Sequence, residues 1–126
     1  MRKVLLFLLI QLALLGSVAS ATFEVDDDLM RSIEDTLKSL DSNIAQKDAK
    51  AAAAEAKELA DLFAQIETYY AGRGDGGEGV THSHKSRELA SQILQGIEAK
   101  DFDAAADVVN NFARTCKACH QVYRKE

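Results

Sequence analysis

Two cysteines and a histidine lie within five residues of one another near the end of the sequence, as Cys116-Lys-Ala-Cys119-His120. In a helix, residues three and four positions apart share one face, so the two thiols and the imidazole would point the same way. C-x-x-C-H is the spacing at which two thiols are joined covalently to haem c. The motif therefore predicts one covalent haem c, with Cys116 and Cys119 as attachment residues and His120 as an iron ligand.

Other chemistry is open to the same side chains. A disulfide between Cys116 and Cys119 would be strained in a helix and would close a very short loop. A zinc site formed with His120 would need His82 or His84 as a fourth ligand, which requires a long loop to fold across. His82 and His84 could also be distal haem ligands or a surface metal site. We expect both to be solvated histidines at the boundary between a loop and a helix.

The first 21 residues have the form of a secretory signal peptide. Arg2 and Lys3 precede an apolar run from Val4 to Leu15, and Ala19-Ser20-Ala21 fits the cleavage rule for small residues. The run is shorter than the ~20 residues that span a bilayer, which favours cleavage over a retained membrane anchor. We expect residues 22–126 to form a single periplasmic domain with no stable membrane insertion.

The charge of this domain restricts its partners. Without residues 1–21 the chain loses two of its 15 basic residues and keeps all 20 acidic ones, so the formal charge moves from −5 to −7. An acidic surface disfavours nucleic acid and anionic lipid, because both are negatively charged. It allows a basic protein partner.

Glycine and proline place the breaks in the chain. There is no proline, and five of the seven glycines lie within residues 72–79, which predicts an all-α chain with one long loop at residues 72–82. Gly72, Gly74 and Gly77 also fit G-x-G-x-x-G, but no strand precedes them, so nucleotide binding is not expected. Gly96, outside this loop, would allow a close helix crossing.

Apolar residues at spacings of three and four predict two helices before the loop. The first begins at Asp26-Asp27-Asp28 and ends near Gln46, and the second begins after Asp48 and ends at Gly72, with aspartates as N-terminal caps. The inward positions are Met30, Ile33, Leu37, Leu40 and Ile44 in the first, and Ala52, Ala56, Leu59, Phe63, Ile66 and Tyr70 in the second.

Two more helices follow the loop. We expect Thr81 or Ser83 to cap the third and Asp101 to cap the fourth. Their inward positions are Ala90, Ile93, Leu94 and Ile97 in the third, and Ala105, Val109, Phe112, Cys116, Cys119 or His120, and Tyr123 in the fourth. The haem motif therefore lies on the inward stripe of the last helix.

A faint repeat indicates how the helices are paired. Residues 44–49 and 97–102 align at an offset of 53, and each segment contains a Lys-Asp pair before an alanine-rich helix. A short turn at each pair would join two antiparallel helices. We therefore predict an antiparallel, up-down-up-down four-helix bundle.

The end of the last helix, Cys116-Lys-Ala-Cys119-His120-Gln-Val-Tyr123-Arg124, fits the signature C-x-x-C-H-x-x-[FY]-R. With the four helices, it resembles the cytochrome c′ and cytochrome c-556 family, which shares the fold of cytochrome b562. The resemblance implies thioether links at both cysteines and His120 as the proximal ligand. It places Arg124 near the haem edge or the proximal face. Independently of the resemblance, three tyrosines could contact the porphyrin or hydrogen-bond a propionate: Tyr69, Tyr70 and Tyr123.

Members of this family differ in the sixth position of the iron. In members like c-556, a methionine early in the first helix binds the iron, whereas in the c′ type the iron is five-coordinate. Met30 is the only methionine after residue 21. It begins the inward seam of the first helix, which the antiparallel topology brings near the end of the fourth. We predict Met30 as the second axial ligand, since a neutral thioether suits haem iron.

These expectations combine into one function. We expect a periplasmic monohaem cytochrome that carries single electrons between redox partner proteins, with iron held by His120 and Met30. The alternative is a five-coordinate protein, similar to cytochrome c′, that binds NO or CO. The sequence contains neither a nucleophile–base pair nor a phosphate-binding loop, so we do not expect an enzyme. The resemblance also allows a homodimer.

Overall fold

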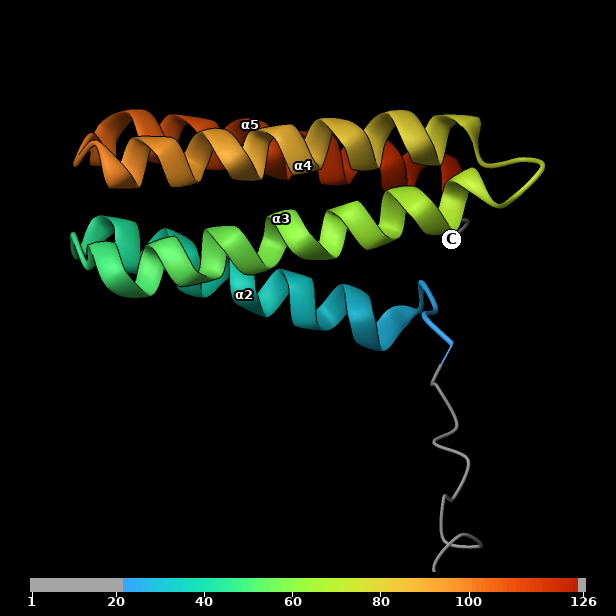
Figure 1. Cartoon of the computed structure of the whole chain (residues 1–126), viewed down its shortest axis with the longest axis horizontal. Coiled ribbons are helices and arrows are strands. Elements are labelled where there is room, and N and C mark those ends of the chain that lie inside the picture. Colours follow the sequence, from blue (N-terminus) through green and yellow to red (C-terminus); the bar gives the residue numbers. More distant parts are fainter. Residues whose placement is uncertain (1–21, 125–126) are drawn as a thin grey trace, which may run out of the picture.

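The computed structural model describes residues 22–124, so the predicted signal peptide lies outside the described residues. The described chain is an all-α bundle of four helices, as predicted, and contains no strand (Figure 1). The helices are α2 (Asp27–Ala45), α3 (Ala49–Ala71), α4 (Gly77–Glu98) and α5 (Phe102–Tyr123). Short connections join successive helices, which run up and down in turn.

Aspartates begin three of the four helices. Asp26, Asp48 and Asp101 each accept a hydrogen bond from the backbone amide three residues further on, at 2.8, 3.1 and 3.1 Å. These bonds satisfy amide groups that have no partner within the helix. The three predicted caps are therefore confirmed.

The two Lys-Asp turns have the same backbone geometry. Lys47 and Lys100 have φ angles of 58° and 59° and are the only non-glycine residues with positive φ in the described chain. Their amides donate to the carbonyls of Ile44 and Ile97, both at 3.0 Å. A left-handed residue after a helix turns the chain back on itself, so both turns produce helical hairpins. The predicted repeat is confirmed at these turns.

The core side chains with no exposed surface lie in the half of the bundle that contains these turns, as Leu40 and Ala90 do. α2 packs against α3 and α5, and α4 packs against the same two helices. Phe63 and Phe112 form an edge-to-face pair with ring centroids 5.2 Å apart. A Cβ atom at Gly96 would lie 3.3 Å from the Cβ atom of Ala105, which confirms the predicted close crossing of α4 and α5.

Burial changes along α2. Ile33, Leu40 and Ile44 of the predicted seam are buried, whereas Met30 and Leu37 are half-buried. Figure 1 shows α2 diverging from α3 towards its N-terminal end. The bundle is therefore closed at one end and looser at the other, where α2 begins and α5 ends.

The predicted loop at residues 72–82 is wrong, because α4 begins at Gly77. Thr81 and Ser83 lie inside this helix and do not cap it; their hydroxyls donate to the carbonyls four residues before, those of Gly77 and Gly79. The connection between α3 and α4 is therefore only five residues long.

Packing explains why a glycine-rich segment is helical here. The ring of Tyr70 lies against Gly79 so closely that a Cβ atom there would overlap it, and the Tyr70 carbonyl similarly excludes a side chain at Gly76. The hydroxyl of Tyr123 accepts a hydrogen bond from the Gly79 amide at 2.8 Å. These glycines permit close contact between helices, whereas their clustering in the sequence predicted a long loop.

Candidate haem site

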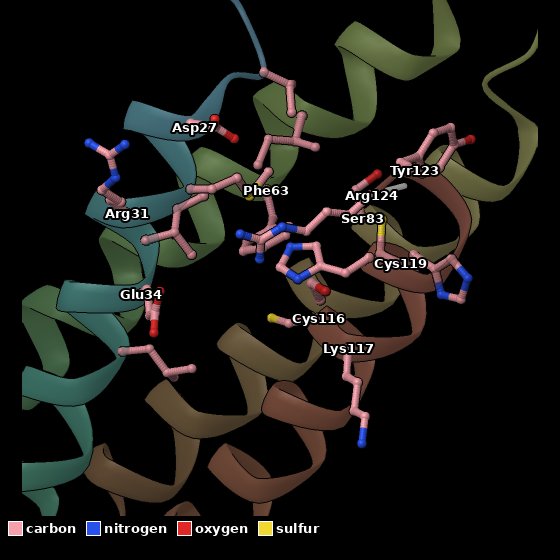
Figure 2. A pocket seen from close by; sticks show the side chains of 18 of the residues that line it. Asp27, Arg31, Glu34, Phe63, Ser83, Cys116, Lys117, Cys119, Tyr123 and Arg124 are labelled. Atoms are coloured by element: carbon pink, nitrogen blue, oxygen red, sulfur yellow. The ribbon is translucent and has the colours of Figure 1, made fainter. Parts of the chain in front are cut away.

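A cavity of about 570 Å³ lies at the looser end of the bundle (Figure 2). This volume is in the range of small-molecule and cofactor sites. All four helices contribute to its lining, which includes Met30, Ile33, Leu37, Phe63, Ile66, Tyr70, His82, Ser83, Ser86, Cys116, Cys119, His120, Tyr123 and Arg124. The predicted attachment residues and iron ligands, together with Tyr123 and Arg124, therefore line one cavity, as does Tyr70, whereas Tyr69 does not.

The C-x-x-C-H motif forms one wall of this cavity. Cys116, Cys119 and His120 are half-buried in the last turns of α5, and both cysteines are free thiols. Figure 2 shows the two sulfur atoms on the cavity side of α5, with Lys117 extending away from them. The inward stripe of α5 reaches the cavity because Cys116 follows Phe112 at a spacing of four.

The thiols lie in an environment that keeps them uncharged. Burial raises the pKa of the Cys116 thiol to about 11, with the neighbouring Cys119 as the second cause. Burial also raises the pKa of Cys119, and the charge of Glu78 adds to this effect. Disulfide exchange and zinc binding both need the thiolate, so this environment disfavours them. It suits uncharged sulfur, as in a thioether.

Met30 lines the cavity from α2, on a different wall from the C-x-x-C-H motif. The first turns of α2 and the last turns of α5 lie at the same end of the bundle because the two helices are neighbours that run in opposite directions. A thioether and an imidazole thus line the same space. This pair of neutral donors fits haem iron, and the two thiols fit its covalent attachment. Ligation by Met30 and His120 stays a prediction.

His82 and His84 lie on different sides of α4. Two residues along a helix differ by about 200° in direction. His82 lines the cavity, whereas His84 is outside it, with Nδ1 3.1 Å from a Glu67 carboxylate oxygen and Nε2 3.3 Å from one of Glu88. The prediction that both stand at a loop–helix boundary is wrong, since both are inside α4.

The zinc alternative has no support in the structure. Within residues 22–124, no three His, Cys, Asp or Glu side chains are grouped closely enough to hold a metal ion. His84, one of the two proposed fourth ligands, is held by Glu67 on the other side of α4. The other, His82, does not complete a cluster with Cys116 and Cys119.

Tyr123 connects the haem motif to α4. Its ring lies 4.8 Å from that of Tyr70, centroid to centroid, and lines the cavity. Its hydroxyl accepts from the Gly79 amide at 2.8 Å and donates to the carbonyl of Asp75 at 3.4 Å. Because the hydroxyl is engaged by backbone groups, the geometry gives no support to a propionate bond. A contact between the ring and the porphyrin stays a prediction.

Arg124 follows the last residue of α5 and is exposed at the edge of the cavity. Its backbone amide donates to the carbonyl of His120 at 2.9 Å, which fixes the backbone of Arg124 beside the motif. A second arginine on the rim, Arg31, already pairs with Asp28 at 3.1 Å. The position of Arg124 is thus compatible with the predicted contact at the haem edge.

Two buried serines of the cavity wall were not predicted from the sequence. Ser83 and Ser86 of α4 are each only 2% exposed and line the cavity. Ser86 lies one turn before Ala90 on the inward face of α4, and Ser83 lies one turn before Ser86. The helical spacing would therefore have predicted both if α4 had been expected to begin at Gly77. The false loop at residues 72–82 hid this signal.

Comparisons with models of protein families, with curated proteins and with solved structures find no match for this chain. A relationship to the cytochrome c′ and c-556 family is therefore supported only by the C-terminal signature and the arrangement of four helices.

Proposed function

We propose that this protein is a periplasmic c-type cytochrome that carries single electrons. One haem c would be attached to Cys116 and Cys119, with His120 and Met30 as axial ligands. The observation that carries this proposal is that the C-x-x-C-H motif of α5 and Met30 of α2 line the same cavity. A haem bound there would supply an iron that accepts and releases one electron.

Different side chains of the cavity would attach, ligate and shield the haem. The two cysteines fix its position along α5, which prevents its loss. Met30 would supply a soft, neutral ligand from α2, a neighbour of α5, and such a ligand raises the reduction potential. Phe63, Ile66 and Leu37 supply apolar surface that excludes water from the site.

The closed end of the bundle supports this role. Leu40, Leu59 and Phe112 are fully buried there and hold the helices that carry the two ligands. A well-packed core resists displacement, so the ligands would keep their positions when the charge on the iron changes. An electron carrier benefits from such a site because little structure has to rearrange during transfer.

The surface is compatible with transient partners. The chain has 20 acidic and 15 basic residues, which favours redox partners with a basic docking face, since opposite charges accelerate encounter. No helix of the described chain has an apolar run long enough to cross a membrane. Export depends on residues 1–21, which the structure does not describe.

The test begins with expression of the full chain in a bacterial host that attaches haem to C-x-x-C-H motifs. We expect red periplasmic protein whose haem stays on the chain after acid–acetone extraction. The variant C116A/C119A should lose the haem in that extraction. A colourless wild-type protein, or one that releases all its haem, would overturn the proposal.

The second axial ligand is tested by spectroscopy. The oxidised protein should show a far-red absorption band from thioether–iron ligation, and this band should be absent in Met30→Ala. An unchanged spectrum in that variant would exclude Met30 as a ligand. Rapid CO binding by the reduced wild-type protein would instead support the five-coordinate alternative.

A further inference from the structure

We propose that His82 is a reserve ligand of the iron, which binds in the position of Met30 when the thioether is lost. This inference rests on the proposed haem site. The cavity contains a second imidazole besides that of His120. It belongs to His82, which lies outside the C-x-x-C-H motif.

The position of His82 is the first observation. It lines the cavity together with Met30 and His120 and is half-buried. It reaches the cavity because α4 begins at Gly77, which places residue 82 in the second turn of a regular helix. Of the three histidines in the chain, His82 and His120 line the cavity, whereas His84 is held outside it by Glu67.

The second observation is a buried hydroxyl one turn along α4. Thr81, Ser83 and Ser91 each donate to the carbonyl four residues before. Ser86 is also on α4, is 2% exposed and lines the cavity, but makes no hydrogen bond to any residue from 22 to 124. This hydroxyl is therefore available to bond with a group that occupies the cavity.

These two residues complement each other. His82 and Ser86 are four residues apart and therefore share one face of α4. An imidazole that binds a metal through one nitrogen usually donates its other N–H to a nearby acceptor, which fixes the ring. Ser86 offers such an acceptor. It acts as a positioning residue for His82.

The chemistry of the two side chains makes His82 a replacement for Met30. Imidazole is a good ligand for haem iron, and a second histidine in place of methionine would lower the reduction potential, because methionine ligation raises it. Loss of the Met30 thioether, by substitution or by oxidation to the sulfoxide, would leave His82 as the one imidazole among the described cavity residues other than His120.

The test uses haem-loaded full chain with Met30→Ala, M30A/H82A and M30A/H84A. Ferric Met30→Ala should remain low-spin in its electron paramagnetic resonance spectrum, without the far-red thioether band. M30A/H82A should become high-spin and bind added cyanide at least about tenfold faster, whereas M30A/H84A should behave like Met30→Ala. A high-spin Met30→Ala, or a low-spin M30A/H82A, would overturn the proposal.

The positioning role is tested in the same background. M30A/S86A should need about tenfold less external imidazole to displace the intrinsic ligand, the usual scale for loss of a group that orients a metal ligand. M30A/S91A, which removes a hydroxyl bonded to its own helix, is the control. Equal imidazole requirements in the two variants would exclude a role for Ser86.

Two further measurements separate the possible failures. If Met30→Ala does not fold, the comparison is made on wild type and His82→Ala after mild oxidation of Met30, the only methionine after residue 21. Low-spin iron only in the protein that retains His82 supports the proposal, and equal spin states overturn it. A wild-type chain without covalent haem refutes the proposed function itself, whereas a haem-bearing chain with high-spin Met30→Ala refutes only the reserve ligand.

Discussion

The hydroxyl oxygen of Tyr123 lies 2.8 Å from the backbone nitrogen of Gly79, 44 residues earlier in the chain. The N-cap of α4, Gly76, has no side chain with which to bind the free amides of the first turn. Tyr123 therefore supplies the missing acceptor from α5. The start of α4, which leads to the cavity residues His82 and Ser86, is thus joined to the turn that carries the haem motif.

Tyr123→Phe should destabilise the fold by about 1–2 kcal/mol, because the Gly79 amide loses its acceptor while the ring still packs on Tyr70. Urea unfolding measures the loss, and hydrogen exchange should show faster exchange at Gly79. Tyr69→Phe removes a hydroxyl that binds the exposed Arg73 and should cost much less. Equal losses in the two variants would contradict the assigned cap.

Gly79→Ala should destabilise the protein by about 2 kcal/mol or more, because the new methyl group would overlap the ring of Tyr70. Gly77→Ala, two residues earlier in the same helix, should stabilise it by about 0.4–1 kcal/mol. No atom lies within 4 Å of a Cβ at Gly77, and alanine favours the helix. Thermal unfolding compares the pair, and a stabilising Gly79→Ala would refute the packing described for Tyr70.

Lys47→Gly and Lys100→Gly should each stabilise the fold by about 0.5–1 kcal/mol. Both lysines have the left-handed backbone conformation, which is strained for residues with a side chain and unstrained for glycine. Lys85→Gly, an exposed position within α4, should instead cost about 1 kcal/mol. Chemical denaturation of the three variants measures these effects. A loss of stability at both turns would show that the lysine side chains contribute more than the backbone strain.

Cys116 should make the stability of the haem-free chain decrease at alkaline pH. Its pKa in the folded state is about 11, above the value of about 8.5 for an unfolded cysteine, so between these values only the folded chain retains the proton. The contribution of the Cys116 thiol to the free energy of unfolding is complete below about pH 8.5. It falls by at most about 1.4 kcal/mol per pH unit towards pH 11. Urea unfolding from pH 8 to 10.5 should show a smaller decrease for Cys116→Ala, and parallel curves would contradict the raised pKa.

Much of the bundle could be predicted because its causes are local. Asp26, Asp48 and Asp101 cap helices through side chains three residues from their partners. The apolar spacing of α3 identifies its buried face correctly throughout, from Ala52 to Tyr70. Both depend on residues within one or two turns, so the sequence carries the information directly.

The site was predictable only in part. The C-x-x-C-H motif is contiguous, and its inward register follows from the α5 stripe. Ser86 and the cavity position of His82 could not be derived, because they depend on where α4 begins. That boundary is set by Tyr70 and Tyr123, which lie on two other helices.

The sequence by itself determined four helices, three aspartate caps, two Lys-Asp turns and a motif with the spacing for haem attachment. Each of these depends on the chemistry of neighbouring residues. The tertiary structure alone decided that the glycine-rich segment is helical, because Gly79 packs against Tyr70 and is capped by Tyr123 across the bundle. It also decided which side chains share the cavity, since α2 and α5 meet only after the chain has folded back on itself.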